Sequence, residues 1–190
     1  MYRQLSFSGE LTFFQKLRSF DYLLLFCVLL LGIVSTFSMY SSEGGQILYY
    51  TKSHFIRFSV FFLLMIALSF IRPTFWHSIG YFFYLIVLGL LFYASLYGIK
   101  ASGSQRWIDL HFVNLQPSEL MKIAIIVCFA RYYHRIQSAD IQSYRFLLIP
   151  IGLLLIPCYL VVSQPDLGTS ILIAGSGLVV IWLAGLNIKY

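Results

Sequence analysis

The chain has 190 residues, of which 59% are hydrophobic and only 11% are charged, and its mean hydropathy is +0.82. A soluble globular domain is roughly half apolar and about a quarter charged, so this composition excludes an ordinary soluble fold and favours a membrane protein. The formal net charge is +6, but the basic residues stand singly between apolar runs, which argues against nucleic-acid binding.

Six apolar runs approach or reach the length of roughly 17 to 25 residues that a helix needs to cross the hydrocarbon core. In chain order they cover residues 22–40, 55–71, 79–97, 117–133, 146–162 and 167–186. The fourth run carries Glu119 and Lys122 in its first turns, so an interfacial or re-entrant segment is the alternative for it. We predict an all-α, polytopic membrane helix bundle that forms a single transmembrane domain over residues 1–190.

The direction of the spans follows from the distribution of basic residues. The first run lacks a small-residue cleavage site after it, so we read it as a retained span and not as a signal peptide. Most Lys and Arg fall on the side that holds the N-terminus, including the basic loop from Arg131 to Arg145. The positive-inside rule then predicts a cytoplasmic N-terminus, with loops 41–54, 98–116 and 163–166 on the outer side.

Cysteine and histidine give no sign of a metal centre. Cys27, Cys128 and Cys158 each lie inside an apolar run without a CxxC partner, so we expect buried spectators rather than disulfides or zinc ligands. The histidines fall in different loops and form no ligand set; they are His54, His77, His111 and His134. We predict no metal site and no cofactor, and leave open whether the protein needs a divalent cation.

The longest outer loop, 98–116, is the most informative segment. After a Gly-Ser entry it brings together a cation, an indole and a carboxylate, in Arg106, Trp107 and Asp109. The loop leads into a helix in which Glu119 and Lys122 are three residues apart, so they share a face and can pair. An ion pair near the edge of a bilayer is costly unless it faces protein or water, so this face indicates a polar groove within the bundle.

Two helices begin with the same residue pattern on the outer side. Gln116-Pro117 is followed by Glu119, and Gln164-Pro165 is followed by Asp166. Proline suits the first turn of a helix and an acid complements the positive end of its dipole. Two such N-termini that open toward one compartment could receive an anionic phosphate group. The alternative is that the two acids only cap their own helices.

Three motifs together resemble the SEDS family (shape, elongation, division and sporulation). They are Gly103 to Leu110, Gln116 to Glu119 with Lys122, and Gln164 to Ser170. The sequences of these motifs are closer to the RodA branch of the family than to its FtsW branch. The resemblance extends over residues 21–186, although outside the motifs it is mainly one of hydropathy.

The resemblance implies a fold of about ten spans in the bacterial cytoplasmic (inner) membrane. Members polymerise lipid II, an undecaprenyl-pyrophosphate-linked disaccharide peptide, on the outer face, and they work with a class B penicillin-binding protein that cross-links the product. The residues expected to border the substrate groove are Arg106, Trp107, Glu119 and Lys122. Those expected at the helix N-termini or in the cavity are Gln116, Gln164, Asp166 and Thr169.

Two departures from the family pattern qualify this expectation. The family's essential acid lies in an outer loop between the seventh and eighth spans, and this chain ends after the sixth. No catalytic residue can therefore be carried over, and we expect the chain to be inactive alone. His111 stands where the family usually has Gly, which would strain a turn that needs a positive φ.

Two functions besides polymerisation are compatible with the sequence. A lipid II flippase would also need a polar cavity among its spans. A non-catalytic scaffold of the cell-wall elongation complex would need only a surface for its partner.

Overall fold

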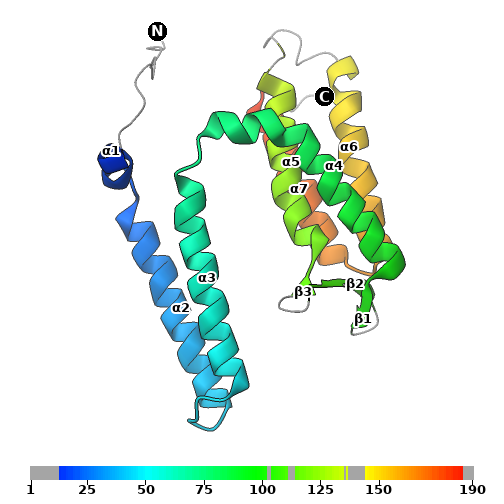
Figure 1. Cartoon of the computed structure of the whole chain (residues 1–190). Helices are drawn as coiled ribbons and strands as arrows, with labels where there is room; N and C mark the ends of the chain where they lie inside the picture. The colour runs from blue at the N-terminus through cyan, green and yellow to red at the C-terminus, as the bar shows by residue number, and fades with distance from the viewer. Residues whose placement is uncertain (1–12, 102–103, 111–113, 135, 137–143, 186–190) are drawn as a thin grey trace. The chain divides into compact units, whose positions relative to one another are not determined.

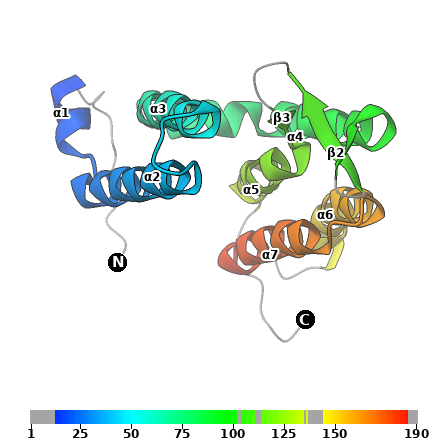
Figure 2. The same ribbon diagram turned by 90° about the horizontal axis from the view of Figure 1, so that it is seen from below.

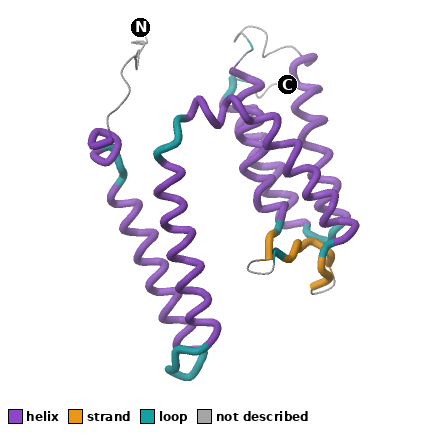
Figure 3. The backbone as a smooth tube through the Cα atoms, in the orientation of Figure 1, coloured by secondary structure: helices purple, strands orange, loops and turns teal. Residues whose placement is uncertain are grey.

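The chain is described by a computed structural model that covers residues 13–101, 104–110, 114–134, 136 and 144–185 (Figures 1 and 3). It divides into two compact units, residues 1–72 and residues 73–190. The first contains α1 (Phe13–Arg18), α2 (Tyr22–Ser42) and α3 (Tyr49–Ser69). In the second, α4 (Pro73–Tyr97) and α5 (Pro117–His134) are followed by α6 (Tyr144–Ser163) and α7 (Leu167–Leu183).

Each of the six predicted spans is helical over most of its length, which agrees with the expected fold class. Four stretches are long and apolar enough to cross a membrane, namely α2, α3, α4 and residues 146–163 of α6. Helix α7 is apolar but has 17 residues. Helix α5 has 18 residues and carries Glu119, Lys122 and Arg131. The boundaries moved most for α3 and α4, each of which begins six residues before the predicted start.

The first unit is built on the hairpin of α2 and α3. Asp21 caps α2 by accepting a hydrogen bond from the backbone N–H of Leu24 at 3.0 Å. In the connecting turn, the carboxylate of Glu43 accepts from the backbone N–H groups of Leu48, Tyr50 and Thr51, which lie at the start of α3 and have no partner within the helix. The turn therefore caps the N-terminus of α3 as well as connecting the two helices.

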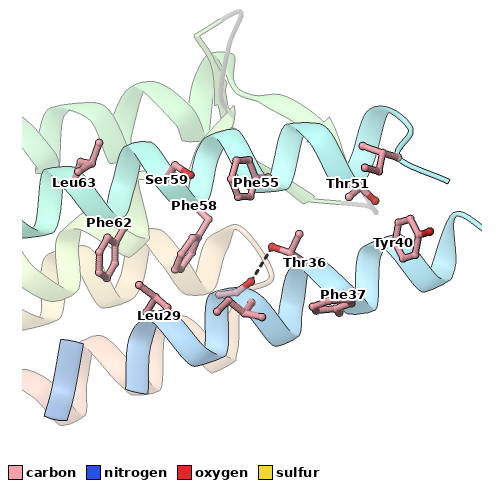
Figure 4. A pocket seen from close by; sticks show the side chains of 13 residues that line it. Leu29, Thr36, Phe37, Tyr40, Thr51, Phe55, Phe58, Ser59, Phe62 and Leu63 are labelled. Carbon is pink, nitrogen blue, oxygen red and sulfur yellow. Dashed lines mark hydrogen bonds between the residues drawn. The ribbon is translucent and has the colours of Figure 1, made fainter. Parts of the chain in front are cut away.

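Close packing of the hairpin depends on Gly32. It is the buried residue of α2, and a Cβ added to it would come within 2.0 Å of the Phe58 ring of α3. Figure 4 shows Phe58 and Phe62 directed toward α2 and bordering a cavity of about 850 Å³. Thr36 donates its hydroxyl back to the Gly32 carbonyl at 2.8 Å.

Replacing Gly32 with alanine should loosen the hairpin. Because the Phe58 ring must shift, we expect a loss of about 1–3 kcal/mol of unfolding free energy, as in overpacked cores. The change can be measured by thermal unfolding in detergent. Gly89→Ala of α4 is the matched control, since a Cβ there meets nothing within 4 Å. The packing account fails if Gly32→Ala costs no more unfolding free energy than Gly89→Ala. It also fails if Gly32→Ala costs as much in a Phe58→Ala background as it does in the parent protein.

The second unit is a four-helix bundle in which α5 packs against both α4 and α7 (Figure 2). The buried residues of α5 recur every three or four positions and form one stripe, which is the pattern of a core-facing helix. They are Pro117, Ser118, Met121, Ala124, Ile125, Cys128, Phe129 and Tyr133. The predicted span with the weakest sequence signal is thus the centre of the bundle, because other helices of the unit pack around most of it.

Small residues let the helices of this unit approach closely. A Cβ on Gly80 of α4 would lie 3.0 Å from the Val127 carbonyl oxygen of α5. On Gly177 of α7 it would lie 2.6 Å from Leu154 of α6, which agrees with the packing role expected for small residues in a membrane helix. Tyr84 also joins α4 to α6 by donating its hydroxyl to the Leu153 carbonyl at 2.7 Å.

A three-stranded antiparallel sheet between α4 and α5 was not predicted. It consists of β1 (Ile99–Ala101), β2 (Ser104–Asp109) and β3 (Asn114–Leu115), in that order. Ile99 pairs with Trp107, and Ile108 pairs with Leu115. His111, where a strained turn was predicted, lies outside the described residues.

Two predictions, the burial of the cysteines and the placement of the histidines in loops, were wrong in part. Cys27 is exposed on α2, whereas Cys128 is buried and Cys158 is half-buried. Three of the four histidines lie in helices rather than loops, and the rings of His77 and His134 are 4.6 Å apart, centroid to centroid. Among the described residues, no group of three His, Cys, Asp or Glu side chains could hold a metal ion.

Candidate functional site

The candidate site is centred on the carboxylate of Asp166, the residue immediately before α7. Its Oδ1 accepts hydrogen bonds from the backbone N–H of Thr169 at 3.3 Å and from the Thr169 hydroxyl at 2.9 Å. Asp166 therefore caps α7, as one of the two interpretations of the sequence predicted. The other carboxylate oxygen, Oδ2, is used by residues from elsewhere in the chain.

Arg106 of β2 forms an ion pair with this second oxygen. Its Nη1 lies 3.0 Å from Asp166 Oδ2, and the side chains are 26% and 13% exposed, respectively. The Nε of Arg106 is buried and, within the described part of the chain, has no hydrogen-bond partner. The guanidinium is thus held at one nitrogen while another donor remains unused.

Gln116, immediately before α5, donates its side-chain amide to the same Asp166 oxygen at 3.2 Å. The residues that precede α5 and α7 are therefore in direct contact. This places the starts of both helices beside Arg106, and a helix start is the positive end of its dipole. One cation and two helix N-termini therefore meet at a single carboxylate. We call this group of residues the Asp166 cluster; its members are Arg106, Gln116, Asp166 and Thr169.

The small sheet holds Arg106 in place. Residues 108 and 109 of β2 pair with Leu115 and Asn114 of β3, which leads directly to Gln116. On the other side β1 begins close to the end of α4, where a Cβ on Gly98 would lie 3.0 Å from the Trp107 carbonyl oxygen. Gln105 adds a hydrogen bond to the Leu96 carbonyl at 3.1 Å. The loop around Arg106 is therefore fixed to both α4 and α5.

Gln164 was expected at a helix N-terminus or in a cavity, and it lies in the turn three residues before α7. Its side chain is 4% exposed and donates to the Leu91 carbonyl of α4 at 3.3 Å. It thereby ties the turn between α6 and α7 to α4, two residues before Asp166. Its contact is with the scaffold of the Asp166 cluster.

Glu119 and Lys122 form the predicted ion pair, with Nζ and Oε2 2.8 Å apart. The Glu119 side chain is 54% exposed and that of Lys122 is 26% exposed. Trp107 is half-buried beside Arg106 in β2. That these three residues and Arg106 border one substrate groove stays a prediction.

Ser118 was not singled out from the sequence as a site residue. It is the second residue of α5, is 1% exposed, and its hydroxyl has no hydrogen-bond partner among the described residues. A short polar side chain inside a membrane helix is a weak sequence signal, because serine is common there as a packing residue.

Comparison with known proteins identifies the family. A family model described as cell cycle protein, FtsW/RodA/SpoVE, matches residues 17–190. The chain belongs to this family. It is 34% identical over 176 residues to the peptidoglycan glycosyltransferase MrdB of Escherichia coli K12, covering 93% of this chain and 46% of that protein. It is 33% identical over 150 residues to a probable peptidoglycan glycosyltransferase FtsW of Buchnera aphidicola, covering 76% and 42%.

Solved structures agree with the predicted fold class. The rod shape determining protein RodA of Thermus thermophilus matches with a TM-score of 0.75 at 23% identity, covering 89% of this chain and 55% of that one. A chain of a peptidoglycan synthase complex matches with a TM-score of 0.79 at 22% identity, covering 90% and 49%. The protein is therefore a polytopic helical membrane protein, and the chain spans about half the length of the relatives it matches.

The pKa of Asp166 gives the Asp166 cluster a testable pH dependence. Burial raises this pKa, but the hydrogen bonds from Thr169 and the hydrogen bond and charge of Arg106 outweigh it, so the pKa lies below its ordinary value of 3.8. A lowered carboxylate pKa stabilises the fold above the unfolded-state value, and this contribution is lost as the pH falls through the lowered one.

Asp166→Asn should therefore unfold at a lower temperature than the parent protein at about pH 6, and the difference should shrink below about pH 4. Thermal unfolding in detergent across this pH range measures it. Asp21→Asn is the control, since asparagine caps a helix as well as aspartate does and Asp21 caps α2. A pH-independent effect of Asp166→Asn would contradict the ion-pair account.

Proposed function

We propose that this chain forms the part of a lipid II polymerase that receives the pyrophosphate end of the substrate at the Asp166 cluster. The observation that carries the proposal is the buried, unused Nε of Arg106 beside two helix N-termini. A guanidinium and helix N-termini are the groups that bind phosphate oxygens most readily. The relatives named peptidoglycan glycosyltransferases support the reaction class.

The proposed role of Arg106 is electrostatic. When a glycosyl bond forms, the pyrophosphate leaves and negative charge develops on it. A cation fixed by Asp166 stabilises that charge without having to reorient during the reaction. The acid that the family resemblance assigns to catalysis lies beyond the sixth span, so the proposed contribution of this chain is binding and charge stabilisation.

The membrane arrangement is proposed along with the activity. We infer that the N-terminus is cytoplasmic, which puts the Asp166 cluster on the outer side of the cytoplasmic membrane, where a lipid II polymerase meets its substrate. The solved peptidoglycan synthase complex, described as coordinating polymerization and crosslinking, supports a class B penicillin-binding protein as the partner.

The test is polymerisation of fluorescent lipid II by the full-length protein in detergent, read as glycan chain length on a gel. Loss of a charged hydrogen bond is worth roughly 1.5–3 kcal/mol, so Arg106→Ala should slow polymerisation about 10- to 100-fold. Arg106→Lys should fall between, because lysine keeps the charge but not the planar fork. Lys52→Ala, in the first turn of α3, is the control expected to polymerise normally.

The runner-up functions predict different results. A flippase would move labelled lipid II between leaflets of a vesicle without making glycan. A scaffold would retain its partner whether or not Arg106 is present. Normal polymerisation by an Arg106→Ala protein would refute the proposed role of the Asp166 cluster.

A further inference from the structure

We propose that Arg57, near the turn of the α2–α3 hairpin, binds the phosphate of an anionic phospholipid from the surrounding membrane, and that an acyl chain of this lipid lies against Phe58 and Phe61. This site belongs to the first unit and does not rest on the proposed polymerase activity.

The position of Arg57 is unusual for a charged residue. Helix α3 is apolar enough to cross a membrane and begins at Tyr49, which puts Arg57 in its third turn. At 1.5 Å per residue this is about 12 Å along the helix. The side chain is exposed rather than inside the hairpin. A charge on such a face is costly unless it reaches the interface or meets an anion.

The guanidinium is directed toward the turn. Its Nε donates to the carbonyl of Ser53, four residues closer to the start of α3, at 3.1 Å. Long basic side chains in membrane helices extend in this way toward the headgroup region. Within the described residues, no carboxylate pairs with Arg57, so its two terminal amino groups remain to bind an anion in the two-pronged geometry that suits phosphate.

A cleft of about 410 Å³ adjoins Arg57 and changes character along its length. It is lined by Met39, Tyr50, His54, Arg57, Phe58 and Phe61. Tyr50, His54, Arg57 and Phe61 recur every three or four residues and so form one stripe of α3. The polar residues lie nearer the turn and the phenylalanines lie deeper. A phospholipid has the same order of polar and apolar parts.

His54 lines this cleft, but its ring contacts helix α2 and we do not assign it to binding the anion. Its Nε2 is 2.8 Å from the Ser35 hydroxyl oxygen of α2, and that hydroxyl donates to the Gly32 carbonyl. This bond holds α3 to α2 beside the cleft, and the Lys or Arg residue of the cleft's lining is Arg57.

The larger cavity of the hairpin fits a phosphate less well. It shares Phe58 with the cleft but extends toward Phe55, Ser59 and Phe62, and none of its lining residues is charged (Figure 4). Charge complementarity thus selects the cleft at Arg57 for the headgroup.

The experiment is native mass spectrometry of the full-length protein in detergent, titrated separately with phosphatidylglycerol and phosphatidylcholine. The parent protein should retain phosphatidylglycerol preferentially. Arg57→Ala should weaken that retention about tenfold, the value of one charge-assisted hydrogen bond, and should leave phosphatidylcholine unchanged. Lys52→Ala is the matched control. It stands five positions before Arg57, so it lies on another face of α3 and should change retention about twofold or less.

Arg57→Lys guards against a folding artefact, and thermal unfolding should show both Arg57 variants intact. Lysine keeps the charge without the fork, so retention should fall between parent and alanine. Three results would overturn the proposal. They are normal phosphatidylglycerol retention by Arg57→Ala, equal losses for Arg57→Ala and Lys52→Ala, and displacement of the lipid by inorganic phosphate, which would make the site one for a free anion.

Discussion

One carboxylate joins three separate parts of the second unit. Asp166 accepts from Thr169 within its own helix, from Gln116 at the start of α5, and from Arg106 on β2. A charged group in a largely apolar bundle must be compensated, and here the compensation comes from segments that are 50 and 60 residues away in sequence. The contacts that compensate the charge of Asp166 therefore also bring a cation and two helix N-termini together. The candidate phosphate site is a consequence of this charge compensation.

The sequence predicted the parts of this arrangement that have a local cause. Long apolar runs predict helices because a bilayer leaves backbone groups no other partners. The repeated Gln-Pro-acid pattern predicted where α5 and α7 begin, and the three-residue spacing predicted the pair of Glu119 with Lys122. The motifs also predicted the family before the comparisons showed it.

What the sequence could not predict depends on contacts between distant segments. The strands of loop 98–116 are short, and their sequence has no alternation of apolar and polar residues from which the pairing could be predicted. Gln164 and Gln116 occupy equivalent positions in the two motifs, yet one bonds to α4 and the other to Asp166, because their helices lie differently in the bundle. Cys27 was expected to be buried since it lies in an apolar run, but an apolar run in a membrane protein is as often directed outward.

The central claim is that Arg106 has a role beyond balancing Asp166, and a neutral pair tests it most directly. Arg106→Met alone leaves the partly buried carboxylate of Asp166 without its cation and should destabilise the protein, whereas Arg106→Met with Asp166→Asn removes both charges and should restore much of the unfolding temperature. We predict that polymerisation of lipid II by this stable double variant of the full-length protein stays at the level of Arg106→Met alone. Recovery of polymerisation together with stability would contradict the account, since it would mean that the ion pair only supports the fold.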